Sequence, residues 1–222
     1  MTENLGWLML WGVMVGLDLA SVMQTMIARP LVAGAVAGFI LGDPVSGITV
    51  GVVLELFALE VLPVGASRYP DYGIGAVAAA AAAVGAPGVF GTGVGVAVGL
   101  VVAYLGGKAV HLVRVENAED VRRHRRQLDA GDSAAVVGVH LRSLGRDVFR
   151  ALIITWVGLL VAGVGPRWIS LNLQGSIYLG IAMVGAAIAA AVTGVGRLTG
   201  RRSGLRWFVL GLAGGLAGVI FG

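Results

Sequence analysis

The sequence predicts an all-α, polytopic membrane protein with broken or re-entrant helices and a cytoplasmic amphipathic arm. Of its 222 residues, 57% are hydrophobic and only 13% are charged, whereas about a quarter of the residues in soluble domains are charged. Several apolar runs approach the ~20 residues that cross a bilayer, and others are too short to do so. The 37 glycines favour close packing of helix backbones in a membrane. This composition excludes an ordinary soluble domain.

The first apolar run, residues 5–28, is predicted to be a retained transmembrane span, because the residues before it lack the basic start of a secretory signal. It contains Asp18 and Gln24. These two polar groups are expected either to bond neighbouring helices or to line a polar path. Arg29 is followed by a proline, and the helix is expected to end there because the residue before proline is biased out of the helical conformation.

The next segment, residues 29–73, mixes apolar residues with charges, glycines and prolines. Its first part, residues 31–42, would cover only ~18 Å as a helix, well short of a ~30 Å hydrocarbon core, which indicates a half-helix or re-entrant arm. The sequence Gly42-Asp43-Pro44 then predicts a helix stop followed by a helix start, with Asp43 as the N-cap.

Two further elements complete this region. Residues 45–62 are predicted to form a second arm that carries Glu55, and residues 73–86 follow a polar break as a second short, alanine-rich element. The two short elements, 31–42 and 73–86, therefore flank the helix that holds Glu55. This pattern predicts hairpins around one acidic site, because broken helices at membrane depth are tolerated where they line protein or water.

The chain divides into three predicted parts. Residues 1–107 form an N-terminal membrane core with re-entrant hairpins and the substrate site. Residues 108–149 form a cytoplasmic or interfacial basic arm, since nine of the 16 lysines and arginines lie at 108–150 and basic loops beside spans stay in the cytoplasm. The second half of the arm alternates apolar and basic positions with helical spacing, as an amphipathic interfacial helix does. Residues 150–222 are expected to form C-terminal transmembrane helices.

The C-terminal part is expected to cross the membrane three times. Spans at 150–164 and 176–195, joined by a short loop around Pro166, lie between the arm and a second basic cluster at 197–206. Two crossings between two cytoplasmic clusters are self-consistent. Residues 207–222 are predicted to form a last, short, glycine-rich span.

An ordered set of short motifs in the N-terminal part carries a family resemblance. The motifs are Arg29-Pro30, Gly42-Asp43, Leu54-Glu55, and Val64-Gly65-Ala66 with Pro70-Asp71. Together they resemble subunit IIC of the mannose, sorbose and N-acetylgalactosamine family of bacterial phosphotransferase-system permeases. The combination is far more specific than any one of its dipeptides, and the overall length and span order are similar as well.

The resemblance implies a multi-pass, sugar-translocating subunit of the bacterial cell membrane. Such a subunit pairs with a subunit IID as a trimer of IIC–IID pairs, binds a hexose-type sugar within the membrane and presents it to phospho-IIB. Subunit IIB takes its phosphate from subunit IIA, so this chain itself is not expected to be an enzyme. Membrane lipids are the other expected partners, and no nucleic acid is expected.

Glu55 is the first candidate for substrate binding. Charged groups at the bilayer centre cost at least ~2.5–3.5 kcal/mol each on insertion scales, so they persist mostly where they face a cavity or a partner. Sugar hydroxyls donate well to an ionised carboxylate. The alternative for Glu55 is a buried ion pair with Arg29 or Arg68.

Three other residues complete the predicted substrate site: Asp71, Gln24 and Asp43. Asp43 is equally well explained as a helix N-cap, and the helix that it caps could also offer its N-terminus to a ligand. Asp71 follows a proline and has the same two explanations, with the family pattern favouring the site. Gln24 is a plausible partner for a sugar hydroxyl.

Two other functions remain open at this point. The first is a secondary transporter, ion-coupled or facilitative, that moves a small polar solute without phosphorylation. The second is an intramembrane enzyme using Asp43, Glu55 and Asp71, which is the weakest because no Ser–His, HExxH or paired-aspartate signature has a useful spacing. The chain has no cysteine, and no catalytic residue, metal ion or cofactor is expected. Genes for subunits IIA, IIB and IID beside this one would favour the phosphotransferase function.

Overall fold

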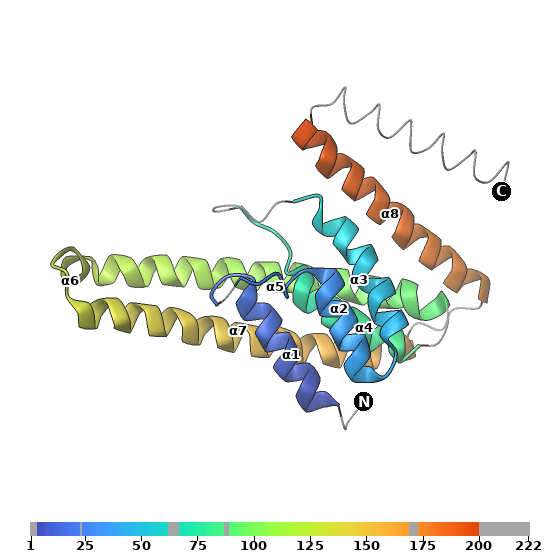
Figure 1. The fold of residues 1–222 in the computed structure, drawn as a ribbon, viewed down its shortest axis with the longest axis horizontal. Helices are drawn as coiled ribbons and strands as arrows, with labels where there is room; N and C mark the ends of the chain where they lie inside the picture. The colour runs from blue at the N-terminus through green and yellow to red at the C-terminus, as the bar shows by residue number, and fades with distance from the viewer. Residues whose placement is uncertain (1–3, 23, 62–66, 87–88, 169–172, 200–222) are drawn as a thin grey trace.

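A computed structural model describes residues 4–22, 24–61, 67–86, 89–168 and 173–199, and this part of the chain is helical with connecting loops (Figure 1). The helices are α1 Leu5–Asp18, α2 Pro30–Leu41, α3 Pro44–Ala58, α4 Tyr72–Val84, α5 Val89–Arg123, α6 Arg125–Asp129, α7 Ser133–Trp168 and α8 Leu173–Thr199. Helices α5, α7 and α8 are long and apolar enough to cross a membrane, whereas α1 to α4 are shorter. The predicted all-α membrane fold with half-length helices is confirmed.

Helices α2 and α3 form the hairpin that the Gly-Asp-Pro sequence predicts. Gly42 has a φ of 83° at the end of α2, a left-handed conformation that glycine adopts readily. The carboxylate of Asp43 accepts hydrogen bonds from the backbone N–H of Ser46 at 3.0 Å and from its hydroxyl at 2.6 Å. Pro44 is the first residue of α3. The predicted stop, N-cap and start are therefore confirmed.

Glycines bring the backbones of α2 and α3 into direct contact. A Cβ atom added at Gly38 would lie 2.7 Å from both the carbonyl oxygen of Asp43 and the Cα of Gly47. Gly34 and Gly51 have equally close backbone neighbours across the same interface. The hairpin is thus held by close backbone packing, as is common between helices in membranes.

The first helix is shorter than the sequence predicts. Helix α1 ends at Asp18, so the expected span over residues 5–28 is wrong. The Asp18 carboxylate accepts hydrogen bonds from the backbone N–H and the hydroxyl of Thr25, at 2.5 and 2.9 Å, and from the backbone N–H of Ala28 at 3.0 Å. Gln24 and Met26 have positive φ angles of 51° and 68°. The carboxylate therefore folds the following residues into a loop.

Helix α4 lies at the centre of the packing. Every residue from Gly73 to Ala83 is buried, and the helix contacts α1, α2, α3, α5 and α7. Its alanine run gives it a small cross-section, which allows several helices to approach it at once. The two predicted short elements do flank the helix of Glu55, because both α2 and α4 pack against α3.

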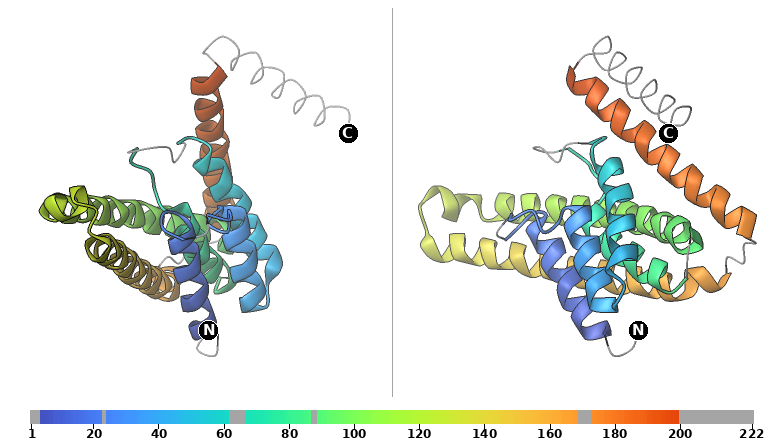
Figure 2. Two further views of the ribbon diagram at one scale, coloured as in Figure 1. Left: turned by 60° about the vertical axis from the view of Figure 1, so that its left-hand side comes forward. Right: turned by 45° about the vertical axis from the view of Figure 1, so that its right-hand side comes forward.

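The basic arm is the far part of a long helical hairpin. Helices α5 and α7 pack against each other and project well beyond the other helices, with α6 at the tip (Figures 1 and 2). Asp120 on α5 joins the two helices, because it accepts hydrogen bonds from Arg142 at 2.9 Å and from Arg146 at 3.1 Å. The predicted part boundaries at 107/108 and 149/150 fall inside α5 and α7.

Two predictions for the C-terminal part need correction. Helix α7 is continuous from Ser133 to Trp168, so no separate span begins at residue 150 and no loop surrounds Pro166. Pro166 lies in the last turn, where its missing amide removes one hydrogen bond without ending the helix earlier. Helix α8 covers the span predicted at 176–195. The span predicted at 207–222 lies outside the described residues.

A buried ion cluster joins three of the helices. The guanidinium of Arg150 on α7 donates to Asp71 at 2.7 Å, to Asp147 at 2.6 Å and to the carbonyl oxygen of Gly16 on α1 at 2.7 Å. The side chains of Arg150, Asp71 and Asp147 are at most 4% exposed. Asp71 also caps α4, because it accepts a hydrogen bond from Ile74 N–H at 3.2 Å.

Replacing Arg150 with glutamine should destabilise the fold by roughly 3–5 kcal/mol, because Asp71 and Asp147 would remain buried without their cation. The measurement is the thermal unfolding midpoint of the detergent-solubilised protein, which we expect to fall. Arg126→Gln is the matched control, since Arg126 is an exposed residue of the arm and its variant should unfold like the wild type. Equal midpoints for all three proteins would contradict a structural role for the cluster.

Gly38→Ala should also destabilise the protein, by about 1–3 kcal/mol, because the added methyl group would overlap the backbone of α3. The control is Gly145→Ala on α7, where an added Cβ has no neighbour within 4 Å. That change should be neutral or stabilising, since alanine favours helices over glycine. The same unfolding measurement checks both variants, and a Gly38→Ala protein as stable as the control would show that the hairpin is loosely packed.

Candidate functional site

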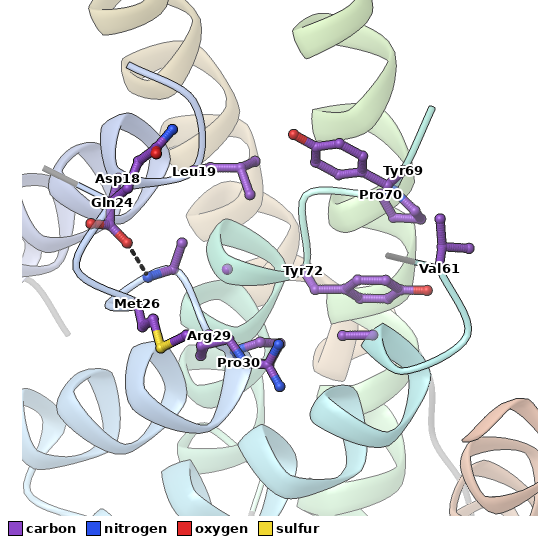
Figure 3. Close-up of a pocket in the computed structure, with 13 residues that line it drawn as sticks. Asp18, Leu19, Gln24, Met26, Arg29, Pro30, Val61, Tyr69, Pro70 and Tyr72 are labelled. Atoms are coloured by element: carbon purple, nitrogen blue, oxygen red, sulfur yellow. Dashed lines mark hydrogen bonds between the residues drawn. The ribbon is translucent and has the colours of Figure 1, made fainter. Parts of the chain in front are cut away.

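A pocket of about 300 Å³ lies where α1 ends, α2 and α4 begin and α3 ends (Figure 3). We call it the central pocket. The residues that line it are Asp18, Leu19, Gln24, Met26, Ala28, Arg29, Pro30, Ala58, Val61, Tyr69, Pro70, Tyr72 and Gly73. Most of this lining is apolar, and a few polar groups converge on it, which is the usual composition of a small-molecule site.

One wall of the central pocket is the loop between α1 and α2. Figure 3 shows Asp18, Gln24 and Arg29 on this side. The hydrogen bonds that Asp18 makes to the loop hold its backbone in place, including the left-handed conformation of Gln24. This wall therefore presents the side-chain amide of Gln24, which can both donate and accept hydrogen bonds, and the guanidinium of Arg29, which can donate them.

The facing wall is the segment before α4. Tyr69 and Tyr72 lie on this side of the pocket (Figure 3). Arg114 on α5 fixes Tyr69, because it donates to the tyrosine hydroxyl at 2.7 Å and its guanidinium carbon lies 5.0 Å from the ring centre. The backbone N–H of Asp71 donates to the carbonyl oxygen of Ala103 at 2.8 Å. This wall is thus attached to α5 at two points.

Glu55 contacts a residue of the central pocket without lining the pocket itself. Its carboxylate forms an ion pair with Arg29 and accepts a hydrogen bond from the backbone N–H of Leu31 at 3.2 Å, at the start of α2. The partner is thus Arg29 and not Arg68, the other arginine that the sequence suggested. Glu55 is not among the residues that line the pocket, but Arg29 is. Any contribution of Glu55 to binding would therefore pass through Arg29, and its role stays a prediction.

The other predicted site residues lie in three different places. Gln24 lines the central pocket. Asp71 is fully buried directly beside it, with its carboxylate turned to Arg150 and Ile74. Asp43 joins the end of α2 to the start of α3, whereas the pocket lies at the opposite ends of these helices. The binding roles of all three stay predictions.

Several pocket residues were absent from the predicted site. Asp18 and Arg29 are charges next to apolar runs, which is the signal that selected Glu55, and Tyr69 and Tyr72 are neighbours of the Pro70-Asp71 motif. These residues meet in one pocket because a loop follows α1. From the sequence, that loop was predicted to be part of a transmembrane span. Among the described residues, no group of three His, Asp or Glu side chains is placed to hold a metal ion.

Half-length helices whose ends meet at a pocket with a few polar groups in a membrane-spanning fold are typical of transport proteins. A family model described as the sorbose-specific IIC component of the phosphotransferase system matches residues 5–199. The chain belongs to this family of multi-pass proteins of the bacterial cell membrane.

Curated relatives carry the same subunit designation. The chain is 32% identical over 135 residues to the fructose permease IIC component of Bacillus subtilis (strain 168), covering 60% of this chain and 49% of the relative. It is 30% identical over 129 residues to the sorbose-specific EIIC component of Lacticaseibacillus casei, covering 58% and 46%. With the mannose-specific EIIC component of Escherichia coli (strain K12) the identity is 28% over 125 residues, covering 56% and 46%. The chain thus spans about half the length of these relatives.

Two solved structures share the fold. One, described as a membrane protein, has a TM-score of 0.73 and 21% identity, and the match covers 100% of this chain and 95% of that one. The other is a complex of the mannose transporter ManYZ with microcin E492, with a TM-score of 0.62, 22% identity and coverage of 96% and 86%. At these identities the likeness concerns the helix arrangement alone.

If the central pocket holds a ligand, Glu55→Gln should weaken its binding by about tenfold or more, because Arg29 would lose its charged partner and with it a fixed position in the pocket wall. The measurement is calorimetric titration of the purified protein with mannose, fructose and sorbose, the sugars in the names of its relatives. Glu119→Gln, which removes an exposed acid of the arm, should bind like the wild type. Unchanged binding by a properly assembled Glu55→Gln protein would remove Glu55 from the site.

Proposed function

We propose that this chain is the sugar-translocating IIC subunit of a phosphoenolpyruvate-dependent sugar phosphotransferase system. It binds a hexose-type sugar in the central pocket, together with a subunit IID, and presents the sugar to phospho-IIB. The central pocket carries this proposal. It is large enough for a small polar molecule, and it lies at the ends of helices that are too short to span a bilayer.

The lining of the central pocket suits a sugar. Gln24 can accept from one hydroxyl and donate to another, and Arg29 can donate to a hydroxyl oxygen. The tyrosine rings opposite offer apolar faces to the carbon skeleton, and each carries a polar tip. Of the predicted binding residues, Gln24 would contact the sugar directly. Glu55 would act indirectly by holding Arg29 in place. Asp71 would act indirectly by fixing the segment before α4, which forms one wall of the pocket.

The chemistry of phosphorylation belongs to other subunits in this proposal. The chain contains no cysteine, and we place phosphoryl transfer on separate IIA and IIB subunits. We also propose a IID partner, in a trimer of IIC–IID pairs. The shared fold with the ManYZ complex supports the partner subunit. Apolar side chains on the short helices, such as Trp7, Phe39 and Val45, are 65 to 74% exposed in the isolated chain, and would face either lipid or this partner.

Gln24→Ala should reduce phosphoenolpyruvate-dependent phosphorylation of the transported sugar by about tenfold, because two hydrogen bonds to hydroxyls would be lost. The assay uses membranes that contain this chain and subunit IID, supplemented with IIA and IIB, and compares mannose, fructose and sorbose. Gln127→Ala removes an exposed glutamine of the arm and should keep full activity.

The same membranes distinguish this function from secondary transport. Sugar that enters vesicles only as its phosphate, and only with phosphoenolpyruvate and IIB present, agrees with the proposal. Accumulation of unmodified sugar without IIB, reduced by Gln24→Ala, would contradict it and would show a secondary transporter that uses the same pocket.

A further inference from the structure

A second pocket of about 260 Å³ lies between the segment before α4 and the middle of α5. We call it the interface pocket. Arg68, Tyr69 and Pro70 line one side, and Tyr104, Lys108 and His111 line the other. It shares Tyr69 and Pro70 with the central pocket but opens on the α5 side of them.

The interface pocket is basic. Arg68 and Lys108 are both exposed, and none of the described residues that line the pocket is acidic. Within the described part of the chain, neither side chain takes part in an ion pair. Lys108 lies with its Nζ atom 5.3 Å from the centre of the Tyr104 ring. Two cations therefore border a hollow in which no described side chain supplies an anion to neutralise them.

The position of this pocket along α5 points to the membrane surface. Residues 89–105 form the apolar run of the helix, and the basic arm begins at Lys108. Tyr104, which is 59% exposed, lies at this boundary, where tyrosine is enriched in membrane proteins. If the apolar run of α5 crosses the hydrocarbon core, the pocket lies at the depth of lipid headgroups.

An apolar strip leads from the pocket into the membrane part of α5. Val101 and Leu105 are 53% and 41% exposed. They lie four residues apart on the face next to that of Tyr104 and Lys108, one turn toward the apolar end of the helix. A molecule with an anionic head in the pocket could lay an acyl chain along this strip.

We propose that the interface pocket binds the phosphate headgroup of an anionic membrane phospholipid. Arg68 and Lys108 contact the phosphate oxygens, the Tyr104 hydroxyl lies at the headgroup, and one acyl chain packs on Val101 and Leu105. Basic pockets beside membrane helices on the cytoplasmic side are suited to such headgroups. A soluble phosphate would use the same cations, but it would gain nothing from the apolar strip.

The test counts the lipids that the purified full chain retains in native mass spectrometry. Delipidated protein is titrated with phosphatidylglycerol, with phosphatidylcholine of the same acyl chains, or with inorganic phosphate. We expect retention of phosphatidylglycerol at concentrations where the other two do not bind. The double variant Arg68→Gln/Lys108→Gln should lower its affinity on the order of tenfold, since each cation near the surface attracts the anionic lipid.

Matched variants complete the test. Lys108→Arg keeps the charge and should retain the lipid, and Arg126→Gln removes an equal charge from the arm and should behave like the wild type. Each single glutamine variant should show part of the loss, so the proposal remains testable if the double variant does not purify. Equal retention of phosphatidylcholine, unchanged binding by the glutamine variants, or displacement of phosphatidylglycerol by inorganic phosphate would overturn it.

Discussion

The fold depends on a buried arginine. Arg150 lies in a long, largely apolar helix, and a charge in such a position is costly unless it is paired and hydrogen-bonded. Asp71, Asp147 and the carbonyl oxygen of Gly16 satisfy it, and each belongs to a different part of the chain. The cluster therefore fixes where α1 ends and where α4 begins relative to α7. Those two ends form opposite walls of the central pocket, so the geometry of the pocket follows from the pairing of this one cation.

Local chemistry made much of the fold predictable. The short α2, the turn at Gly42 and the cap at Asp43 depend on residues within a few positions of each other. The end of α1 could not be predicted in this way, because the partners of Asp18 lie seven and ten residues further on. The residues between them are apolar enough to resemble the rest of a span. The hydrogen bonds of the Asp18 carboxylate thus favour a loop over a helix at residues whose composition alone predicts a helix.

The candidate site was predictable as a set of unusual residues but not as an arrangement. Acids in apolar segments stand out in the sequence, and Glu55 and Asp71 were predicted as site residues for this reason. Neither is among the residues that line the central pocket, so their roles stay predictions. Their partners are 26 and 79 residues away in the sequence, and no spacing rule connects them. Nothing in the local sequence marks the tyrosines of the facing wall as site residues. Their position depends on the tertiary contact between Arg114 of α5 and Tyr69. A pocket formed by helix ends depends on how the helices pack together. The hydrophobic periodicity of the sequence predicts the helices themselves but not how their ends are arranged.

The length of α5 has a mechanical consequence. Its 35 residues make a rod of ~52 Å that ends at the tip of the arm. Ala103, which accepts a hydrogen bond from Asp71, lies near its middle, and Arg114, which holds Tyr69, lies nine residues before its end. The helix has no break between these places and the tip, so no hinge absorbs a tilt of the arm. A load on the tip of the arm is therefore transmitted along an unbroken helix to Tyr69, and so to a wall of the central pocket.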